Sequence, residues 1–160
     1  LTRAKEYNEG DSIVLIHDGV RPLINDKVIE DNIENVQKYG TSITCSPCFE
    51  TPIVSSNGET VDSVLQRNTI YTAKAPQCFI LDEILDAHDK VRSTSLGYND
   101  KKIVDSCSLF MSIGKEVHLT EGNRENIKVT TVEDYINLLA SLSIEDQKQI
   151  FLLQEQEEKR

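Results

Sequence analysis

The stretch SIVLIHDGVRP, Ser12–Pro22, joins a short apolar run to a charged turn. Its four consecutive apolar residues are typical of a strand that is covered on both faces of a sheet. Gly19 and Pro22 end that strand, and Asp18 and Arg21 stand beside them. Charges just past the carboxyl end of a buried strand occupy the place where open α/β sheets bind ligands. The stretch therefore predicts either a ligand-binding strand end or one that carries only a weak surface ion pair.

The residues that follow predict a strand–helix–strand unit. Residues 24–40 carry apolar side chains on one helical face, with Asn25 or Asp26 as the cap and Gly40 as the end. Residues 41–48 are rich in β-branched side chains, which favours a strand. Two strands joined by one helix over so short a distance form a βαβ unit, so we expect the two strands to be parallel.

From Thr51 the sequence changes to short β-rich pieces separated by Asn57-Gly58, the dipeptide most typical of a tight hairpin. Residues 51–74 therefore predict a protruding antiparallel arm. Beyond the arm, helices are expected over 80–93, 103–114 and 130–142, and strands over 116–122 and 126–130. The last of these helices should begin at a capping box of Thr130 and Glu133. The tail, residues 145–160, is predicted to be a charged helix that frays.

Composition excludes several classes of protein. With 160 residues, 38% of them hydrophobic and 28% charged, we expect one soluble domain. A net charge of −10 argues against a nucleic-acid surface, and no apolar run reaches the roughly 20 residues of a membrane span. Four cysteines without a recognisable secretory signal predict free thiols and a cytoplasmic location. Cys45 and Cys48 have CxxC spacing, but no second pair for zinc and no helix start for redox chemistry accompanies them, so ordinary cysteines are expected.

Three separated pieces of sequence place a charge beside a small or turn residue. HDGVRP carries Asp18 and Arg21, LQRNT carries Arg67, and EGNRENIKVTT carries Lys128. An acid with several cations, and no plausible His–Ser or Cys–His pair, favours metal-assisted phosphate chemistry over acyl transfer. In phosphoryl and nucleotidyl transfer, the expected parts are an aspartate for Mg²⁺ and cations for the phosphate oxygens.

HDGVRP, APQCF and EGNRENIKVTTVEDY stand in an order and spacing that closely resembles the polyol-phosphate cytidylyltransferases, over about residues 12–142. The resemblance implies a Rossmann-like, three-layer α/β fold with a mixed sheet and a protruding β-arm through which two copies form a homodimer. It implies transfer of a cytidylyl group from CTP to a polyol phosphate, methylerythritol 4-phosphate or ribitol 5-phosphate, with Mg²⁺. The products are then a CDP-polyol and pyrophosphate.

The same resemblance implies a role for five residues. Asp18 matches the acid that binds Mg²⁺, and Lys128 matches the lysine that steadies the phosphates in the transition state. Arg21 matches an arginine at the polyol-phosphate site. Arg67 matches an arm arginine that reaches the partner subunit's substrate, and Asp105 matches an acid of the substrate-binding loop.

Departures from the family's pattern qualify this interpretation. Ala75 and Val104 stand where the family has threonines, which favours a cell-surface polyol such as ribitol over methylerythritol. The family's glycine-rich AAGxGxR loop has no counterpart, so residues 1–144 are interpreted as the C-terminal two-thirds of a cytidylyltransferase domain, inactive alone.

One alternative is a non-catalytic dimerisation or regulatory fragment that binds no CTP. The other is a glycosyltransferase on a similar fold, which would want a second metal-binding acid near Asp18.

Overall fold

The computed structural model describes residues 1–8, 11–94 and 102–144, and its contacts divide them into two compact units. The first unit contains Leu1–His17 and Asn25–Asn123. The second contains Asp18–Ile24 and the described residues from Arg124 on. The predicted helical tail, 145–160, lies outside the described residues.

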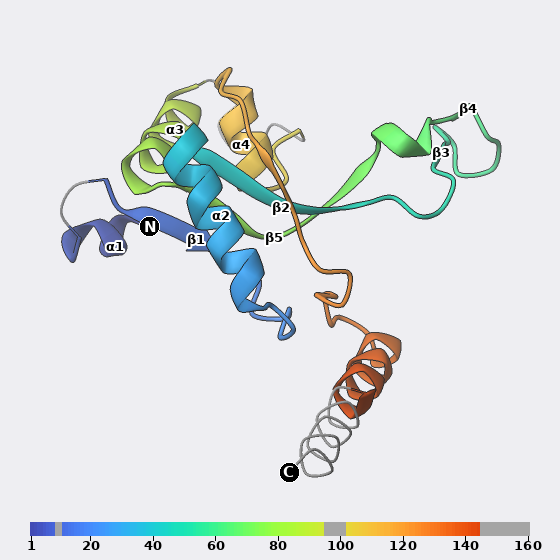
Figure 1. The fold of residues 1–160 in the computed structure, drawn as a ribbon. Coiled ribbons are helices and arrows are strands. Elements are labelled where there is room, and N and C mark those ends of the chain that lie inside the picture. The colour runs from blue at the N-terminus through green and yellow to red at the C-terminus, as the bar shows by residue number, and fades with distance from the viewer. Residues whose placement is uncertain (9–10, 95–101, 145–160) are drawn as a thin grey trace, which may run out of the picture. The chain divides into compact units, whose positions relative to one another are not determined.

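The first unit is built on a four-stranded sheet in the order β1-β5-β2-β6 (Figure 1). The strands are β1 (Ile13–Ile16), β2 (Thr41–Pro47), β5 (Tyr71–Ile80) and β6 (Leu119–Glu121). Because β5 is antiparallel to both β1 and β2, these two strands are parallel, as the βαβ pattern predicts, but β5 lies between them. β6 pairs parallel with β2. The expected α/β fold with a mixed sheet is confirmed.

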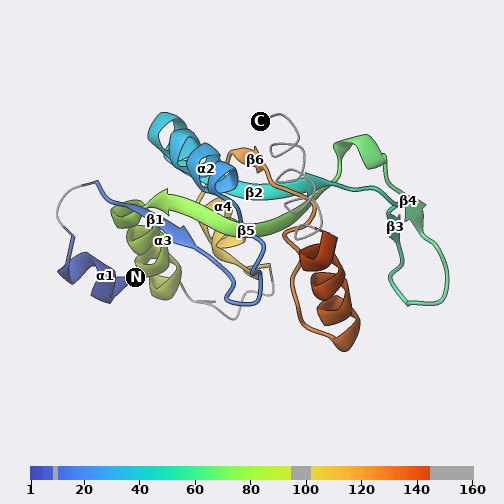
Figure 2. The same cartoon turned by 60° about the horizontal axis from the view of Figure 1, so that its bottom comes forward.

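Helices cover both faces of this sheet (Figure 2). Helix α2 (Asp26–Tyr39) joins β1 to β2; the side chain of Asn25 caps its start by accepting a hydrogen bond from Val28 N, and Gly40 ends it at a φ of 80°. On the other face lie α3 (Leu81–Ser93), which follows β5 directly, and α4 (Ser106–Ser112). The short α1 (Thr2–Glu6) is tied to α3 by the ion pair of Lys5 with Asp82. The three expected layers are therefore present.

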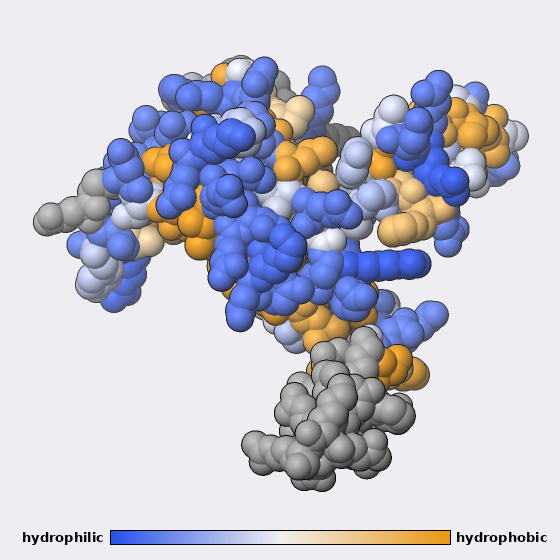
Figure 3. Space-filling model, in the orientation of Figure 1, coloured by the Kyte–Doolittle hydropathy of each residue, from blue (hydrophilic) through white to orange (hydrophobic). Residues whose placement is uncertain are grey.

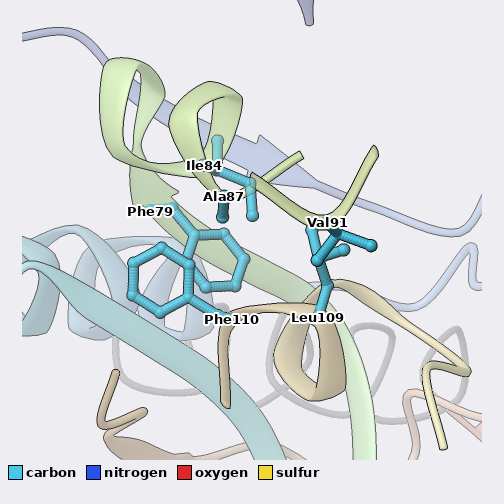
Figure 4. Close-up of a cluster of buried hydrophobic side chains, with 6 residues drawn as sticks. All are labelled: Phe79, Ile84, Ala87, Val91, Leu109 and Phe110. Carbon is cyan, nitrogen blue, oxygen red and sulfur yellow. The ribbon is translucent and has the colours of Figure 1, made fainter. Parts of the chain in front are cut away.

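The main hydrophobic core lies between the sheet and the pair α3 and α4 (Figure 4). The rings of Phe79 on β5 and Phe110 on α4 pack with centroids 5.0 Å apart. The remaining buried members of this cluster are Ile84, Ala87, Val91 and Leu109. The helix expected over 80–93 thus contributes Ile84, Ala87 and Val91 to this core.

The interface of α2 with the sheet is polar instead. Asn32 is fully buried, donates to Thr44 Oγ1 at 2.9 Å and accepts from Ser42 Oγ at 2.8 Å. Asn35 donates to Thr120 Oγ1 on β6 at 2.6 Å. Because every one of these bonds needs a specific partner, the network fixes how α2 sits over β2 and β6.

The arm extends from the ends of β2 and β5, where β3 (Ile53–Val54) pairs antiparallel with β4 (Ser63–Val64). Several apolar side chains on it are exposed, and they gather on the face shown in Figure 3. Asn57-Gly58 does not form the expected tight hairpin, because the strands are joined by the longer loop 55–62. Within that loop, Asn57 Oδ1 accepts hydrogen bonds from Glu59 N and Thr60 N, which makes a side-chain turn in place of a two-residue one.

In the second unit, residues 132–144 are helical. The capping box lies one residue later than expected: Asp134 N donates to Thr131 Oγ1, and the Asp134 carboxylate accepts from Thr131 N and Thr130 N. The strand expected over 126–130 is absent; this stretch is instead bonded to the turn 18–22, where Val129 N donates to Val20 O at 2.8 Å and Arg21 Nη1 donates to Asn126 O at 3.0 Å. Among the described residues, no helix is long and apolar enough to cross a membrane.

Candidate active site

The second unit brings together three of the predicted site residues, Asp18, Arg21 and Lys128. Arg21 Nε donates to Asp18 Oδ2 at 3.1 Å. Lys128 Nζ lies 3.4 Å from the same carboxylate oxygen. Two cations therefore converge on one oxygen of a single acid.

The backbone of the HDGVRP turn produces this arrangement. Arg21 N donates to Asp18 O at 3.0 Å, which closes a turn around Gly19 and brings the two side chains to one side. Arg21 Nη1 also donates to Asn126 O at 3.0 Å, and its side chain is only 10% exposed. Together with the Val129–Val20 bond, this contact holds the 126–129 stretch along the turn and so places Lys128 beside Asp18.

The charges set the ionisation of Asp18. Burial alone opposes ionisation, but the hydrogen bond from Arg21 and the charge of Lys128 outweigh it and hold the pKa of Asp18 below its ordinary value. The Asp18 side chain is 39% exposed and that of Lys128 is 50% exposed. The group therefore presents an ionised acid and a solvent-accessible cation to a ligand.

The carboxylate of Asp18 fits an Mg²⁺ ion that takes most of its other ligands from phosphate and water. Both described side-chain contacts of this carboxylate fall on Oδ2, which leaves Oδ1 for a metal. Within the described part of the chain, no three His, Cys, Asp or Glu side chains come together as a metal cage. Mg²⁺ commonly uses one or two carboxylates with substrate phosphates, so Asp18 alone is compatible with it.

Arg67 lies in the first unit, in the short 3₁₀ turn η1 (Arg67–Thr69) at the base of the arm. It is exposed, and its Nη1 donates to Phe49 O at 2.9 Å. Figure 1 shows the arm extending away from α4 and the body of this unit. Within the first unit, the structure therefore does not bring Arg67 together with Asp105.

Asp105 is the N-cap of α4. Its Oδ1 accepts hydrogen bonds from Ser108 N and Ser108 Oγ, each 2.7 Å long, and its Oδ2 accepts one from Gln77 Nε2 at 2.8 Å. Burial opposes ionisation here as well, but the bonds from Ser108 and Gln77 lower the pKa of Asp105 below its ordinary value. The acid is thus ionised and largely engaged in holding the start of α4.

Sequence reasoning missed two residues that hold site side chains: Gln77, which donates to Asp105, and Asn126, whose carbonyl accepts from Arg21. The sequence does carry a usable signal for Gln77. It stands two residues before Phe79 on β5, so the two side chains share a face and a long polar side chain falls on the core face of a buried strand. Asn126 gave none, because it receives Arg21 through its backbone carbonyl, which any residue offers.

The two departures from the family's threonines fall in different surroundings. Ala75 is buried in β5, whereas Val104 is 81% exposed, directly before Asp105. Val104 and Asp105 line a cavity of about 250 Å³ together with residues of α3 and α4. The described surroundings of Val104 therefore leave its side chain accessible to a ligand.

Comparison with known proteins identifies the family. The family of 2-C-methyl-D-erythritol 4-phosphate cytidylyltransferase (IspD) matches residues 3–143. A ribitol-5-phosphate cytidylyltransferase of Vibrio parahaemolyticus is 40% identical over 151 residues, 94% of this chain and 62% of that protein. A 2-C-methyl-D-erythritol 4-phosphate cytidylyltransferase of Clostridium novyi is 38% identical over 123 residues, 76% of this chain and 51% of that protein.

The fold agrees with a solved structure. The 4-diphosphocytidyl-2C-methyl-D-erythritol synthase of Anaerococcus prevotii superposes with a TM-score of 0.75 at 27% identity, covering 89% of this chain and 64% of that one. Fold and site define an α/β protein with a mixed sheet, in which a turn acid is paired with two cations. The chain belongs to the polyol-phosphate cytidylyltransferase family, and it spans about 62% of the length of its Vibrio relative.

Proposed function

We propose that this protein catalyses cytidylyl transfer from CTP to a polyol phosphate. A phosphate oxygen of the polyol phosphate attacks the α-phosphorus of CTP, and the bond from that phosphorus to the oxygen bridging to the β-phosphorus breaks. The products are a CDP-polyol and pyrophosphate. The observation that carries this proposal is the convergence of Arg21 and Lys128 on Asp18 in a member of this family.

The three grouped residues divide the work of charge neutralisation. Asp18 would hold Mg²⁺, which neutralises phosphate charge when it is bound. Arg21 is fixed by Asp18 and Asn126 O, so it offers a pre-oriented cation to the phosphate of the polyol. Lys128 is half exposed, so its ammonium group is available to the phosphate oxygens as charge develops on them. Preorganised cations of this kind are the main means of catalysis in phosphoryl and nucleotidyl transfer.

The arm is proposed to complete the site of a second copy of the chain. Its exposed apolar side chains, Ile53, Val61 and Val64 among them, are typical of a surface that a partner covers. Arg67 stands at the base of this surface with an exposed guanidinium group. In a homodimer joined through the arms, Arg67 would bind the phosphate of the polyol in the partner's site.

Asp105 is proposed to contact the polyol, and ribitol 5-phosphate is the proposed substrate. Two observations support ribitol over methylerythritol. The Vibrio relative named for ribitol 5-phosphate is 40% identical over 94% of this chain, whereas three relatives named for the methylerythritol compound are 35–38% identical over 76–83% of it. In addition, Val104 removes a hydroxyl group from a ligand-accessible position beside Asp105.

Residues 1–160 alone are proposed not to turn over CTP. The seven glycines of the sequence stand singly, so the 160 residues contain no glycine-rich loop of the kind whose N–H groups cradle a triphosphate. The second candidate function follows from the same fact: a dimerisation or regulatory module that keeps the arm and binds no CTP. Equilibrium binding of CTP with Mg²⁺ to the complete gene product and to residues 1–160 separates the two.

The test of the function is a substrate assay of the complete gene product. It is incubated with CTP, Mg²⁺ and either ribitol 5-phosphate or methylerythritol 4-phosphate, and the nucleotide products are separated by anion exchange. We expect a CDP-polyol and an equal amount of pyrophosphate, with ribitol 5-phosphate the better substrate. No CDP-polyol from either compound would overturn the proposal.

A further inference from the structure

Gln77 lies on β5, one of the two inner strands of the sheet. It pairs with Ile16 on β1 and with Ile43 on β2, so its backbone is held from both sides. Its side chain belongs to the face of β5 that carries Phe79 and packs against α3 and α4. Burying a long amide on such a face is unfavourable unless both of its ends are hydrogen bonded.

Both ends of the Gln77 amide are bonded to the start of α4. Nε2 donates to Asp105 Oδ2 at 2.8 Å, and Oε1 accepts from Cys107 N at 2.9 Å. The acceptor on Asp105 and the donor on Cys107 allow only one orientation of the amide. Gln77 therefore acts as a two-point clamp between the sheet and the first turn of this helix.

The clamp matters because it connects the first turn of a short helix directly to the sheet. The helix has only seven residues, too few to be stable without tertiary contacts. Leu109 and Phe110 anchor its later part in the core. At its start, Asp105 bonds to Ser108 within the helix itself, and the bonds from Gln77 connect that first turn to β5.

We infer that Gln77 is a positioning residue for the polyol: it fixes the Asp105 carboxylate and the Val104–Ser106 stretch against the sheet so that they meet the substrate in one arrangement. This inference rests on the proposed function, in which Asp105 contacts the polyol. The hydrogen bonds that the Asp105 carboxylate already accepts limit where it can bind a substrate hydroxyl group. Oδ1 already takes two hydrogen bonds and Oδ2 takes one, so the free lone pair lies on the oxygen that Gln77 orients.

The decisive variant is Gln77→Met, which keeps the length of the side chain and removes both hydrogen bonds. We expect the KM for the polyol phosphate to rise by about tenfold or more, because small misplacements of a substrate contact have large effects on rate and binding. The KM for CTP should stay within about twofold, since no CTP contact is assigned to Asp105. In Gln77→Glu, which also keeps the length of the side chain but sets a carboxylate against Asp105, the rise in this KM should be at least as large.

Asn32→Leu is the matched control, because it also removes a buried amide with two side-chain partners, but on the opposite face of the sheet. We expect it to lower the melting temperature as Gln77→Met does and to leave the KM for the polyol phosphate unchanged. Equal effects of the two variants on that KM would overturn the inference. So would a Gln77→Met enzyme whose KM values for CTP and the polyol phosphate rise in parallel.

A second measurement separates failure of this inference from failure of the proposed function. The titration of Asp105, followed by carbon NMR of its carboxyl group, needs no substrate. Loss of the Gln77 hydrogen bond should raise the pKa of Asp105 in Gln77→Met, and an unchanged pKa would contradict the clamp. If the wild-type protein makes no CDP-polyol, the proposed function and the polyol role of Gln77 are both wrong, whatever the Asp105 titration shows.

Discussion

Lys128 Nζ lies 3.4 Å from Asp18 Oδ2, although the two residues come from distant parts of the sequence. Two hydrogen bonds hold the two stretches beside each other: Val129 N donates to Val20 O, and Arg21 Nη1 donates to Asn126 O. Asp18 and Arg21 of the HDGVRP turn thereby join Lys128 in a group with one acid and two cations. That group is the chemical centre of the proposed reaction.

The depressed pKa of Asp18 predicts a specific dependence of stability on pH. The two cations stabilise the ionised carboxylate, so their contribution is complete above the ordinary pKa of an aspartate and is lost as the pH falls through the lower pKa of the folded protein. The melting temperatures of the wild type and of Asp18→Asn should therefore differ at pH 6 and converge in strong acid. A difference that persists unchanged below the pKa of Asp18 would contradict this cause.

Gly122 should not tolerate alanine, because a Cβ atom there would overlap the methyl group of Thr44 beside the buried network under α2. We expect Gly122→Ala to lower the free energy of unfolding by about 1–3 kcal/mol, the usual cost of overpacking. The control is Gly19→Ala, where nothing lies within 4 Å of the added atom. Urea unfolding of both variants tests this, and equal stabilities would show that the 122 backbone moves freely away from Thr44.

The cysteines should differ sharply in reactivity. Burial raises the pKa of the fully buried Cys78 thiol to about 12, and burial with the nearby charge of Asp105 raises that of Cys107 to about 11. Only thiolates alkylate at an appreciable rate, so iodoacetamide at pH 8 should modify the part-exposed Cys48 first and leave Cys78 intact until the protein unfolds. Peptide mass mapping over time gives the order. Alkylation of native Cys78 as fast as Cys48 would contradict its burial.

Arg67 is predicted to act in the partner's site. Arg67→Ala and Asp18→Ala homodimers should each be inactive, whereas mixed dimers should recover activity because one of their two sites keeps both residues. Co-expression with two different affinity tags yields the mixed dimer for assay. If a verified mixed dimer stays inactive, Arg67 acts within its own subunit or outside the chemistry.

Local signals in the sequence predicted local structure well. The cap at Asn25 and the stop at Gly40 gave the bounds of α2 nearly to the residue, because each needs only its neighbours. The capping box was placed one residue early because Thr130 and Thr131, followed by Glu133 and Asp134, offer two equivalent boxes, and the choice depends on where the chain enters the helix. The Asn57-Gly58 hairpin failed because Asn57 bonds to its own following backbone.

Features that depend on distant partners could not be predicted in this way. The strand β5 lies between β1 and β2 in the sheet, and the residue pattern of a single strand does not determine its neighbours. Asp18, Arg21, Arg67 and Lys128 could be proposed as site residues because charges at strand ends and in loops are visible in sequence, and the structure brings Asp18, Arg21 and Lys128 together. The partners that hold two of the site side chains, Gln77 for Asp105 and the Asn126 carbonyl for Arg21, appear only in the folded chain.

The most direct test of the account is pyrophosphate release by the complete gene product and its Asp18→Ala variant, with CTP, Mg²⁺ and ribitol 5-phosphate. Asp31→Ala serves as the matched control, because it removes an aspartate from a surface ion pair with Lys27. We predict that Asp18→Ala loses about a hundredfold or more in rate, as expected when a preorganised charge is removed from the reacting phosphates, while Asp31→Ala keeps the wild-type rate. A rate for Asp18→Ala within about tenfold of wild type would contradict the central claim.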